Sequence, residues 1–315
     1  MTSYRPATFD ESRALYDIFE ATVDDLSRRM GYQANSTADD PDPWAVRRPL
    51  WEHLARTGEP AWLAVDDDGR PIGYARSILR DGDRELTEFF VLPGHQSGGI
   101  GRELLDRAFP AGAGAAHRSV IATGDPRALG RYLKAGLEMR FPIVTFMGRP
   151  TTEAIPTDLE LEPFVGSASA LAALDRVDRR VIGHRRSEDH RWLGGQRSAV
   201  VARRGGRVVG YAYAGRFQGP IAALDPADLP ALLGWAASTA ASTAASTAAE
   251  AAPGPAAPEP AAPEIGFDVP LTNVVAVRHL LERGYRLDPF ITYYLSDGPP
   301  GRFDRYVVTS PPLFI

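Results

Sequence analysis

Residues 89–101 read FFVLPGHQSGGIG. The apolar run ends at Pro93, which has no N–H to donate and therefore stops a strand. Glycines follow at positions 98, 99 and 101, and the sequence IGRELLDRAF then places its apolar residues on one helical face. A helix N-terminus has unpaired N–H groups and the positive end of a dipole, so this loop suits an anion, with Gln96 and Arg102 able to support the charge.

Two well-known phosphate loops do not fit this stretch. A Walker loop requires Gly-Lys-Ser/Thr, which does not follow the glycines here. A dinucleotide-binding fingerprint requires a parallel βαβ unit near the start of a domain, whereas several strands of antiparallel type precede this loop. These two loop types are therefore rejected, and glycines that serve only the turn between strand and helix remain an alternative to an anion site.

Composition narrows the class of protein. A chain of 315 residues predicts two domains, and 44% hydrophobic residues suffice for two cores. The net charge of −5 argues against nucleic-acid binding, and the absence of cysteine excludes disulfides, thiolate metal sites and cysteine nucleophiles. The N-terminus has no apolar signal region and no run is long enough to span a membrane, so we expect a cytoplasmic protein.

The two halves of the chain resemble each other. GRPIGYA (69–75) matches GRVVGYA (206–212), and RYLKAGLEMR (131–140) resembles HLLERGYRL (279–287) in the same order. In the second half, the Ala/Ser/Thr/Pro-rich segment 236–264 lies between the two matched stretches, 206–212 and 279–287. It is interpreted as an insertion, a helix tail that runs into a linker. We therefore predict a duplication, with domains at 1–150 and 151–315.

Hydrophobic periodicity predicts the same series of elements twice. In the first half we expect helices at 11–29, 44–57 (interrupted at Pro49), 99–109 and 126–135, and strands at 4–9, 61–66, 71–79, 85–92, 118–123 and 138–148. In the second half we expect helices at 168–182, 226–249 and 273–283, and strands at 159–165, 198–203, 207–217, 265–269 and 286–295. The mixture predicts an α/β protein of the α+β type.

The glycine stretch resembles the signature of the GNAT (GCN5-related) N-acetyltransferases, V-x-P-x-x-[QR]-x-x-G-x-[GA], which residues 91–101 match in full. The resemblance implies two GNAT-like domains, each with a mixed, mostly antiparallel central sheet flanked by helices. It also implies acetyl-CoA as co-substrate and no metal. The residues that would contact the coenzyme are Val91, Leu92, Gln96, Ser97, Gly98, Gly99, Ile100, Gly101, Arg102 and Asp125.

A second family feature concerns the general acid. Family members often carry a tyrosine four residues before a Gly-Leu or Gly-aromatic pair, and Tyr132 precedes Gly136 by four. The resemblance implies that Tyr132 protonates the departing thiolate, with packing of a helix aromatic as the alternative. Asp125 stands where the family often has Asn; it can cap the helix equally well, but it lacks an amide donor for the coenzyme.

The general base and the oxyanion donors are less well defined by the sequence. The family frequently uses a glutamate on the strand before the loop as general base, which implies Glu88 in this role. Glu85 is an alternative base, and either glutamate could instead be a solvated strand residue without a catalytic role. The backbone N–H groups near Val91 and Leu92 are candidates for stabilising the oxyanion.

The acceptor would lie near the segment between the first two helices, GYQANSTADDPDPW (31–44). Its acidic and aromatic residues Tyr32, Asp39, Asp40 and Trp44 suit a cationic amine, although an exposed acidic loop is the simpler interpretation. The predicted function is acetyl-CoA-dependent N-acetylation of a primary amine of a small molecule, by direct transfer in a ternary complex. The alternatives are an acyl-CoA-binding sensor or scaffold without turnover and a protein N-acetyltransferase.

The second half lacks the groups that this chemistry requires. AALDPADLPAL (222–232) contains no glycine, and it places prolines and aspartates where a phosphate would sit. Leu280 occupies the position of Tyr132, while Asn273 remains at the start of the helix. We therefore predict a degenerate second module, with its C-terminal Ile315 as a further candidate to enter the active site. His184 and His190 are interpreted as part of a polar helix surface.

Overall fold

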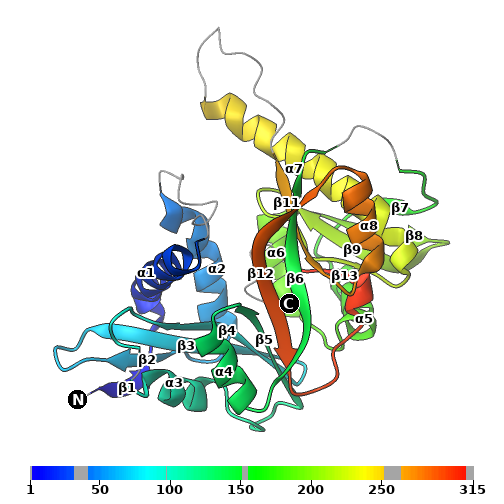
Figure 1. The fold of residues 1–315 in the computed structure, drawn as a ribbon. Helices are drawn as coiled ribbons and strands as arrows, with labels where there is room; N and C mark the ends of the chain where they lie inside the picture. Colours follow the sequence, from blue (N-terminus) through cyan, green and yellow to red (C-terminus); the bar gives the residue numbers. More distant parts are fainter. Residues whose placement is uncertain (1, 32–41, 97, 151–154, 252–263, 310–315) are drawn as a thin grey trace. The chain divides into compact units, whose positions relative to one another are not determined.

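The computed structural model describes residues 2–31, 42–96, 98–150, 155–251 and 264–309. They form two compact units (Figure 1). Unit 1 comprises the described residues up to Met139 together with Leu295–Gly298, and unit 2 comprises Arg140–Tyr294 and the described residues from Pro299 onward. The predicted boundary at residue 150 follows the sequence repeat, whereas the compact units divide at 139/140.

Unit 1 contains a five-stranded run in the order β1-β2-β3-β4-β5. Neighbouring strands are antiparallel except for the parallel pair β4 and β5. Its elements are β1 (Ser3–Pro6), α1 (Ser12–Met30), α2 (Pro43–Thr57), β2 (Trp62–Val65), β3 (Pro71–Arg80), β4 (Asp83–Val91), α3 (Ile100–Ala108), β5 (His117–Thr123) and α4 (Pro126–Lys134).

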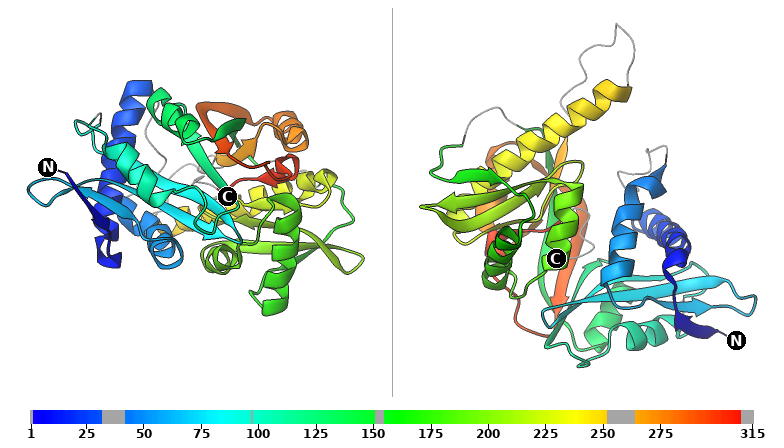
Figure 2. Two further views of the ribbon diagram at one scale, coloured as in Figure 1. Left: turned by 90° about the horizontal axis from the view of Figure 1, so that it is seen from below. Right: turned by 180° about the vertical axis from the view of Figure 1, so that it is seen from behind.

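The helices of unit 1 cover both faces of its sheet (Figures 1 and 2). On β4, Phe90 contacts Phe19 of α1, while the adjacent Phe89 contacts Tyr132 of α4. Successive side chains of a strand point to opposite faces. The pair α1 and α2 therefore packs on one face of β4, and α3 and α4 pack on the other.

Unit 2 contains two groups of strands, a run β12-β6-β11 and a five-stranded sheet β13-β10-β9-β8-β7. Strand β6, which the sequence repeat assigns to the first half, pairs antiparallel with β11. The elements are β6 (Glu138–Gly148), β7 (Glu160–Pro163), α5 (Ala168–Val181), α6 (Ser187–Gln196), β8 (Ser198–Arg204), β9 (Arg207–Ala214), β10 (Ile221–Ala223), α7 (Leu229–Ala251), β11 (Ile265–Pro270), α8 (Val274–Glu282), β12 (Arg286–Ser296) and β13 (Tyr306–Val307).

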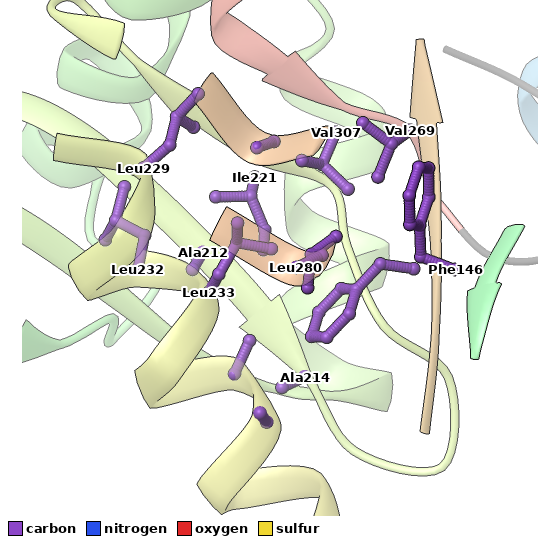
Figure 3. Packing of buried hydrophobic residues seen from close by; sticks show 14 of the residues in the cluster. Phe146, Ala212, Ala214, Ile221, Leu229, Leu232, Leu233, Val269, Leu280 and Val307 are labelled. Carbon is purple, nitrogen blue, oxygen red and sulfur yellow. The ribbon is translucent and has the colours of Figure 1, made fainter. Parts of the chain in front are cut away.

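The core of unit 2 is apolar (Figure 3). Leu229, Leu232 and Leu233 of α7 pack there with Leu280 of α8 and Phe146 of β6. Ala236, Ala237 and Ala240 of α7 are buried in this core, and the first Ser/Thr pair of the repeats, at 238–239, lies among them. The low-complexity segment therefore begins as a packed helix, and its first turns are part of the core.

The predicted α+β fold class is confirmed, but several local predictions were wrong or incomplete, and the two-residue strand β13 was among the elements missed. Helix α2 continues through Pro49, because one missing backbone bond costs less than the burial of Leu50, Trp51 and Leu54 contributes. The short strand β10 and helix α6 were not predicted, since three residues and a charged pattern give little periodicity. No helix among the described residues is long and apolar enough to cross a membrane.

Candidate functional site

The site is built around an opening in the sheet of unit 1. Strands β4 and β5 pair only from Asp83 to Leu86 on β4, although β4 continues to Val91. On the other side of β4 the register with β3 shifts, so that Glu88 faces Arg76 and Leu86 faces Ser77, which leaves Thr87 as a bulge. A bulge bends its strand and increases the local twist. Beyond Leu86, β4 therefore separates from β5.

The loop after β4 leads into α3 through glycines with positive φ angles. Gly94 and Gly99 both have φ of 86°, a conformation that favours glycine, and Gly99 is the N-cap of α3. Gly98 has no such constraint, and a Cβ added there would meet nothing within 4 Å. Neither backbone strain nor packing within the described chain requires glycine at position 98. An approaching ligand would explain it.

Backbone donors remain available in this loop. Among the described residues, the amides of Gln96, Gly98, Gly99 and Ile100 have no backbone acceptor, whereas Arg102 and its successor donate to the Gly99 carbonyl. No side chain caps α3. The first N–H groups of a helix have no partner inside the helix. The loop thus offers the donors and the open space that a diphosphate group needs, and the residues fit such a ligand.

Gln96 links the loop to the neighbouring elements. Its Nε2 donates to the Val91 carbonyl at 2.8 Å, and its Oε1 accepts from Arg127 Nη1 at 2.7 Å. The Val91 carbonyl, at the end of the separated strand, is therefore covered by a side-chain amide. The Leu92 N–H donates to Ile72 O at 2.9 Å. Leu92 is thus already bonded in this structure, which leaves Val91 as the better candidate for the oxyanion donor.

Asp125 holds the start of α4. Its carboxylate accepts from the Arg127 N–H at 2.9 Å and pairs with the guanidinium groups of Arg127 and Arg29 at 3.0 and 3.2 Å. Partial burial would raise the pKa of Asp125, but the bonds from Arg127 and Arg29 lower it below its ordinary value. The residue is therefore an ionised cap, and its predicted coenzyme contact stays a prediction.

Tyr132 lies on the α3–α4 face of β4, where only 5% of its surface is exposed. Its ring centroid is 6.1 Å from that of Phe89. Burial, and then the charge of Asp125, raise the pKa of the phenol well above its ordinary value, while Arg131 opposes the shift. The phenol therefore stays protonated at neutral pH, the state in which it can donate a proton.

Glu88 lies on the opposite face of β4, buried beside α2. Its carboxylate is 3.0 Å from Arg76 Nε and accepts a 2.8 Å hydrogen bond from the Tyr74 hydroxyl. Burial raises the pKa of Glu88, although Arg76 and Tyr74 oppose the shift. Glu85 is also buried, but it lies on the part of β4 that still pairs with β5. Of the two glutamates, Glu88 is the one at the opening of the sheet.

The remaining predicted residues are not brought together with these groups. The Arg102 side chain is 72% exposed and lies 3.7 Å from Glu103. Trp44 contacts the ring of Tyr16, and the guanidinium of Arg13 lies over its indole ring, 5.8 Å from the centroid. Tyr32, Asp39, Asp40, Ser97 and Ile315 lie outside the described residues.

The corresponding loop of unit 2 is closed to an anion. Asp225 accepts from Ala227 N at 3.0 Å, and the buried Asp228 pairs with Arg204 at 2.7 Å. Leu229, at the start of α7, and Leu280, at the position of Tyr132, both lie in the hydrophobic core. Asn273 caps α8 through Ala276 N at 3.1 Å. Unit 2 therefore repeats the helix cap but has neither the open loop amides of unit 1 nor a counterpart of the Tyr132 phenol.

The interpretation of His184 and His190 as surface residues was wrong. His190 is completely buried, with Nε2 2.8 Å from Asp178 and Nδ1 3.0 Å from the Tyr213 hydroxyl, and His184 is 8% exposed. Arg186 pairs with the same aspartate at 2.9 Å. Arg186, the N-cap of α6, and His190, four residues later, both contact the buried Asp178, so contacts to a carboxylate replace the solvation that the pattern suggested.

The sequence repeat relates this network to the one around Glu88. The shared motif GR--GYA aligns Tyr74 with Tyr211 and Arg76 with Tyr213. Tyr74 and Arg76 hold Glu88, whereas Tyr211 and Tyr213 hold Asp178 and His190. In both modules the repeated tyrosine, Tyr74 or Tyr211, donates to a buried carboxylate, and this repeat was the signal in the sequence.

Comparison with known proteins identifies the class. Residues 18–137 match the model of the Acetyltransferase (GNAT) family, so this segment is a GNAT-family domain. The whole chain resembles a putative acetyltransferase from Pyrococcus horikoshii, at 15% identity and a TM-score of 0.70, with 97% of this chain and 92% of that chain covered.

Two further structures share the arrangement of elements. A tandem GNAT protein from the clavulanic acid biosynthesis pathway is 13% identical, with a TM-score of 0.56 and coverage of 95% of this chain and 99% of that chain. A GCN5-related N-acetyltransferase from Sphaerobacter thermophilus is 15% identical, with a TM-score of 0.56 and coverage of 94% and 95%. The chain therefore has a tandem GNAT fold.

Proposed function

We propose that unit 1 is an acetyl-CoA-dependent N-acetyltransferase that acts on a primary amine of a small molecule. The observation that carries the proposal is the glycine loop, which has open space at Gly98 and unpaired amides before α3, next to a strand that has left its neighbour. Gln96, Gly98, Gly99, Ile100 and Gly101 would hold the diphosphate, and the coenzyme would supply the activated acetyl group.

The chain's own residues would divide the proton transfers between the two faces of β4. Glu88, on the α1–α2 face, would accept a proton from the acceptor amine, directly or through water. Tyr132, on the α3–α4 face, would give a proton to the departing sulfur, and the Val91 N–H is the candidate for stabilising the oxyanion. The chain contains no cysteine, which favours direct transfer in a ternary complex over a thioester on the protein.

The acceptor side of the proposal rests on the α1–α2 face. Glu88 is held there in a buried position by the Tyr74 hydroxyl, and the ring of Tyr74 in turn contacts that of Phe90. The acidic residues of segment 31–44 suit a cationic acceptor by their charge alone. We therefore propose a small amine as acceptor.

Release of free thiol from acetyl-CoA in the presence of a panel of small amines tests the proposal. We expect turnover with the wild type and a loss of about 100-fold or more in Gly98→Val, because the added side chain occupies the open space of the loop. Gly195→Val is the matched control, since Gly195 in α6 of unit 2 also has nothing within 4 Å. Coenzyme binding without thiol release for any amine would indicate a sensor instead, and release only with a protein substrate would indicate a protein acetyltransferase.

A further inference from the structure

One cation beside the glycine loop has not yet been given a role. A Cβ placed on Gly101, in the first turn of α3, would lie 3.3 Å from both Cζ and Nε of Arg131 and 3.1 Å from Cζ of Phe89. The guanidinium of Arg131 therefore reaches from α4 to the backbone of the first turn of α3. Glycine at position 101 makes this approach possible, so its role differs from that of Gly98.

The charge of Arg131 is not neutralised within the part of the chain that the structure describes. Arg29 and Arg127 both pair with Asp125, whereas no carboxylate among the described residues pairs with Arg131. The side chain is half-buried, so water screens its charge less than that of a fully exposed arginine. A guanidinium without a carboxylate partner among the described residues thus lies against the helix turn that begins with the unpaired amide of Ile100.

We propose that Arg131 binds the diphosphate of the coenzyme and so determines the preference for a nucleotide-bearing thioester. This inference rests on the proposed function of the glycine loop. Backbone amides contribute partial charges, while a guanidinium contributes a full charge and two parallel N–H groups that match phosphate oxygens. The excess positive charge in the free protein would be balanced by the bound diphosphate.

A simpler interpretation is that Arg131 only stabilises α4, because basic residues are favourable in the last turn of a helix. Lys134 lies in the same last turn of α4 and is exposed. Lys134→Met is therefore the matched control for Arg131→Met, and Arg131→Lys keeps a charge while removing the planar fork. Thermal unfolding of each variant establishes that it is folded.

The experiment compares the dissociation constants of acetyl-CoA, of acetyl-dephospho-CoA and of S-acetylpantetheine, which has the thioester and arm but no phosphate. We expect Arg131→Met to weaken binding of both nucleotide forms by about 10- to 100-fold and to leave S-acetylpantetheine unchanged. Lys134→Met should bind all three like the wild type, and Arg131→Lys should recover part of the loss.

Three results would overturn the assignment. Equal affinity of Arg131→Met and wild type for acetyl-CoA would remove Arg131 from the site. An equal loss for S-acetylpantetheine would mean that Arg131 acts on the arm or on the fold. A loss confined to acetyl-CoA, with acetyl-dephospho-CoA unaffected, would place Arg131 at the 3′-phosphate. A wild type that binds none of the three ligands would instead overturn the proposed function itself.

Discussion

At the scale of single residues, the site assigns opposite protonation states to two buried groups. Tyr132 and Glu88 lie on opposite faces of β4, and burial raises the pKa of both. For the phenol this favours the protonated acid at neutral pH. For Glu88, the raised pKa means that the carboxylate is protonated at a higher pH than an exposed glutamate, while Arg76 and Tyr74 limit the shift. The two groups therefore predict different pH behaviour.

Replacement of Tyr132 by Phe should lower kcat by about 100-fold or more, because the departing thiolate loses its proton donor. The dissociation constant of acetyl-CoA should stay unchanged, as the ring still packs on Phe89. Steady-state kinetics and calorimetry measure the two quantities. Tyr285→Phe, which alters a buried tyrosine of unit 2, serves as the control and should keep full turnover. Normal turnover in Tyr132→Phe would remove the residue from the mechanism.

Glu88 should determine the acid limb of the pH–rate profile. Its basic form is lost as the pH falls through its pKa, which burial raises above the ordinary value, so kcat/KM should decline on the acid side at a higher pH than an exposed glutamate would give. Glu88→Gln should lose about 100-fold or more in kcat/KM and should lack this limb. Glu85→Gln is the comparison and should keep the acid limb of the pH–rate profile. If the limb disappears in Glu85→Gln and not in Glu88→Gln, the general base is Glu85.

Several of these residues were predictable from the sequence, and their environments were not. The loop motif and the spacing of Tyr132 identify positions because local backbone chemistry fixes them. The pairing of Glu88 with Arg76, of Arg131 with the first turn of α3, and of His190 with Asp178 depends on how separate elements pack against each other. Charged residues in a sequence are expected to be exposed to solvent unless their buried partners are known.

At the scale of elements, the strand–loop–helix segment of unit 1 separates two uses of glycine. Gly99 adopts a left-handed conformation that caps α3, whereas Gly98 has an ordinary conformation and open space around it. Gly99 is needed for the backbone conformation, whereas Gly98 leaves space beside the loop for a ligand. The elements themselves were predictable, because strand and helix periodicities are clear on both sides of the loop. The bulge at Thr87 that opens the sheet gave no signal in the sequence.

Gly99→Ala should destabilise unit 1 by about 1–2 kcal/mol, the cost of the left-handed region for a residue with a Cβ. Gly98→Ala should leave the free energy of unfolding unchanged. Urea denaturation of both variants measures the difference. Equal stability of the two would mean that the N-cap of α3 relaxes without strain.

The buried network between α5, α6 and β9 should control the stability of unit 2. Burial alone would raise the pKa of Asp178, but Arg186 and His190 lower it below its ordinary value. A carboxyl with a depressed pKa stabilises the folded state above its unfolded pKa, near 4, and this contribution is lost as the pH falls further.

Asp178→Asn should therefore cost about 3–5 kcal/mol at neutral pH, because it leaves the buried Arg186 guanidinium without its carboxylate. Chemical denaturation measures the loss, and the difference from wild type should shrink at acid pH. Asp158→Asn, which removes an exposed partner of Arg204, is the control and should unfold at the denaturant concentration of the wild type. Unchanged stability of Asp178→Asn would show that the network contributes no net energy.

At the scale of the whole molecule, the two modules are built from similar elements, whereas the groups proposed for catalysis lie in unit 1. Unit 2 has core leucines at the start of α7 (Leu229) and in α8 (Leu280). The corresponding places in unit 1 hold the glycine loop before α3 and Tyr132. The tandem arrangement was predictable from two short repeats, since each preserves a turn or a helix end. The boundary between the compact units was not, because the repeat does not show where β6 finds its partner.

Calorimetric titration with acetyl-CoA should give a stoichiometry of one per chain. Gly98→Val should abolish the heat of binding entirely, since we expect no second site in unit 2. A stoichiometry of two, or residual binding by Gly98→Val, would assign a coenzyme to the second module. Gly195→Val should retain the wild-type stoichiometry.

The pairing of β6 with β11 has a consequence for how this gene can be divided. The residues of β6 that contact β11 include Ile143, Val144 and Phe146, all buried in unit 2. A chain cut at the repeat boundary would carry these residues away on the first fragment and leave β11 with a bare edge on the second. Exposed apolar edges of this kind promote aggregation. We therefore expect a fragment that begins after residue 150 to aggregate unless residues 140–148 are supplied with it.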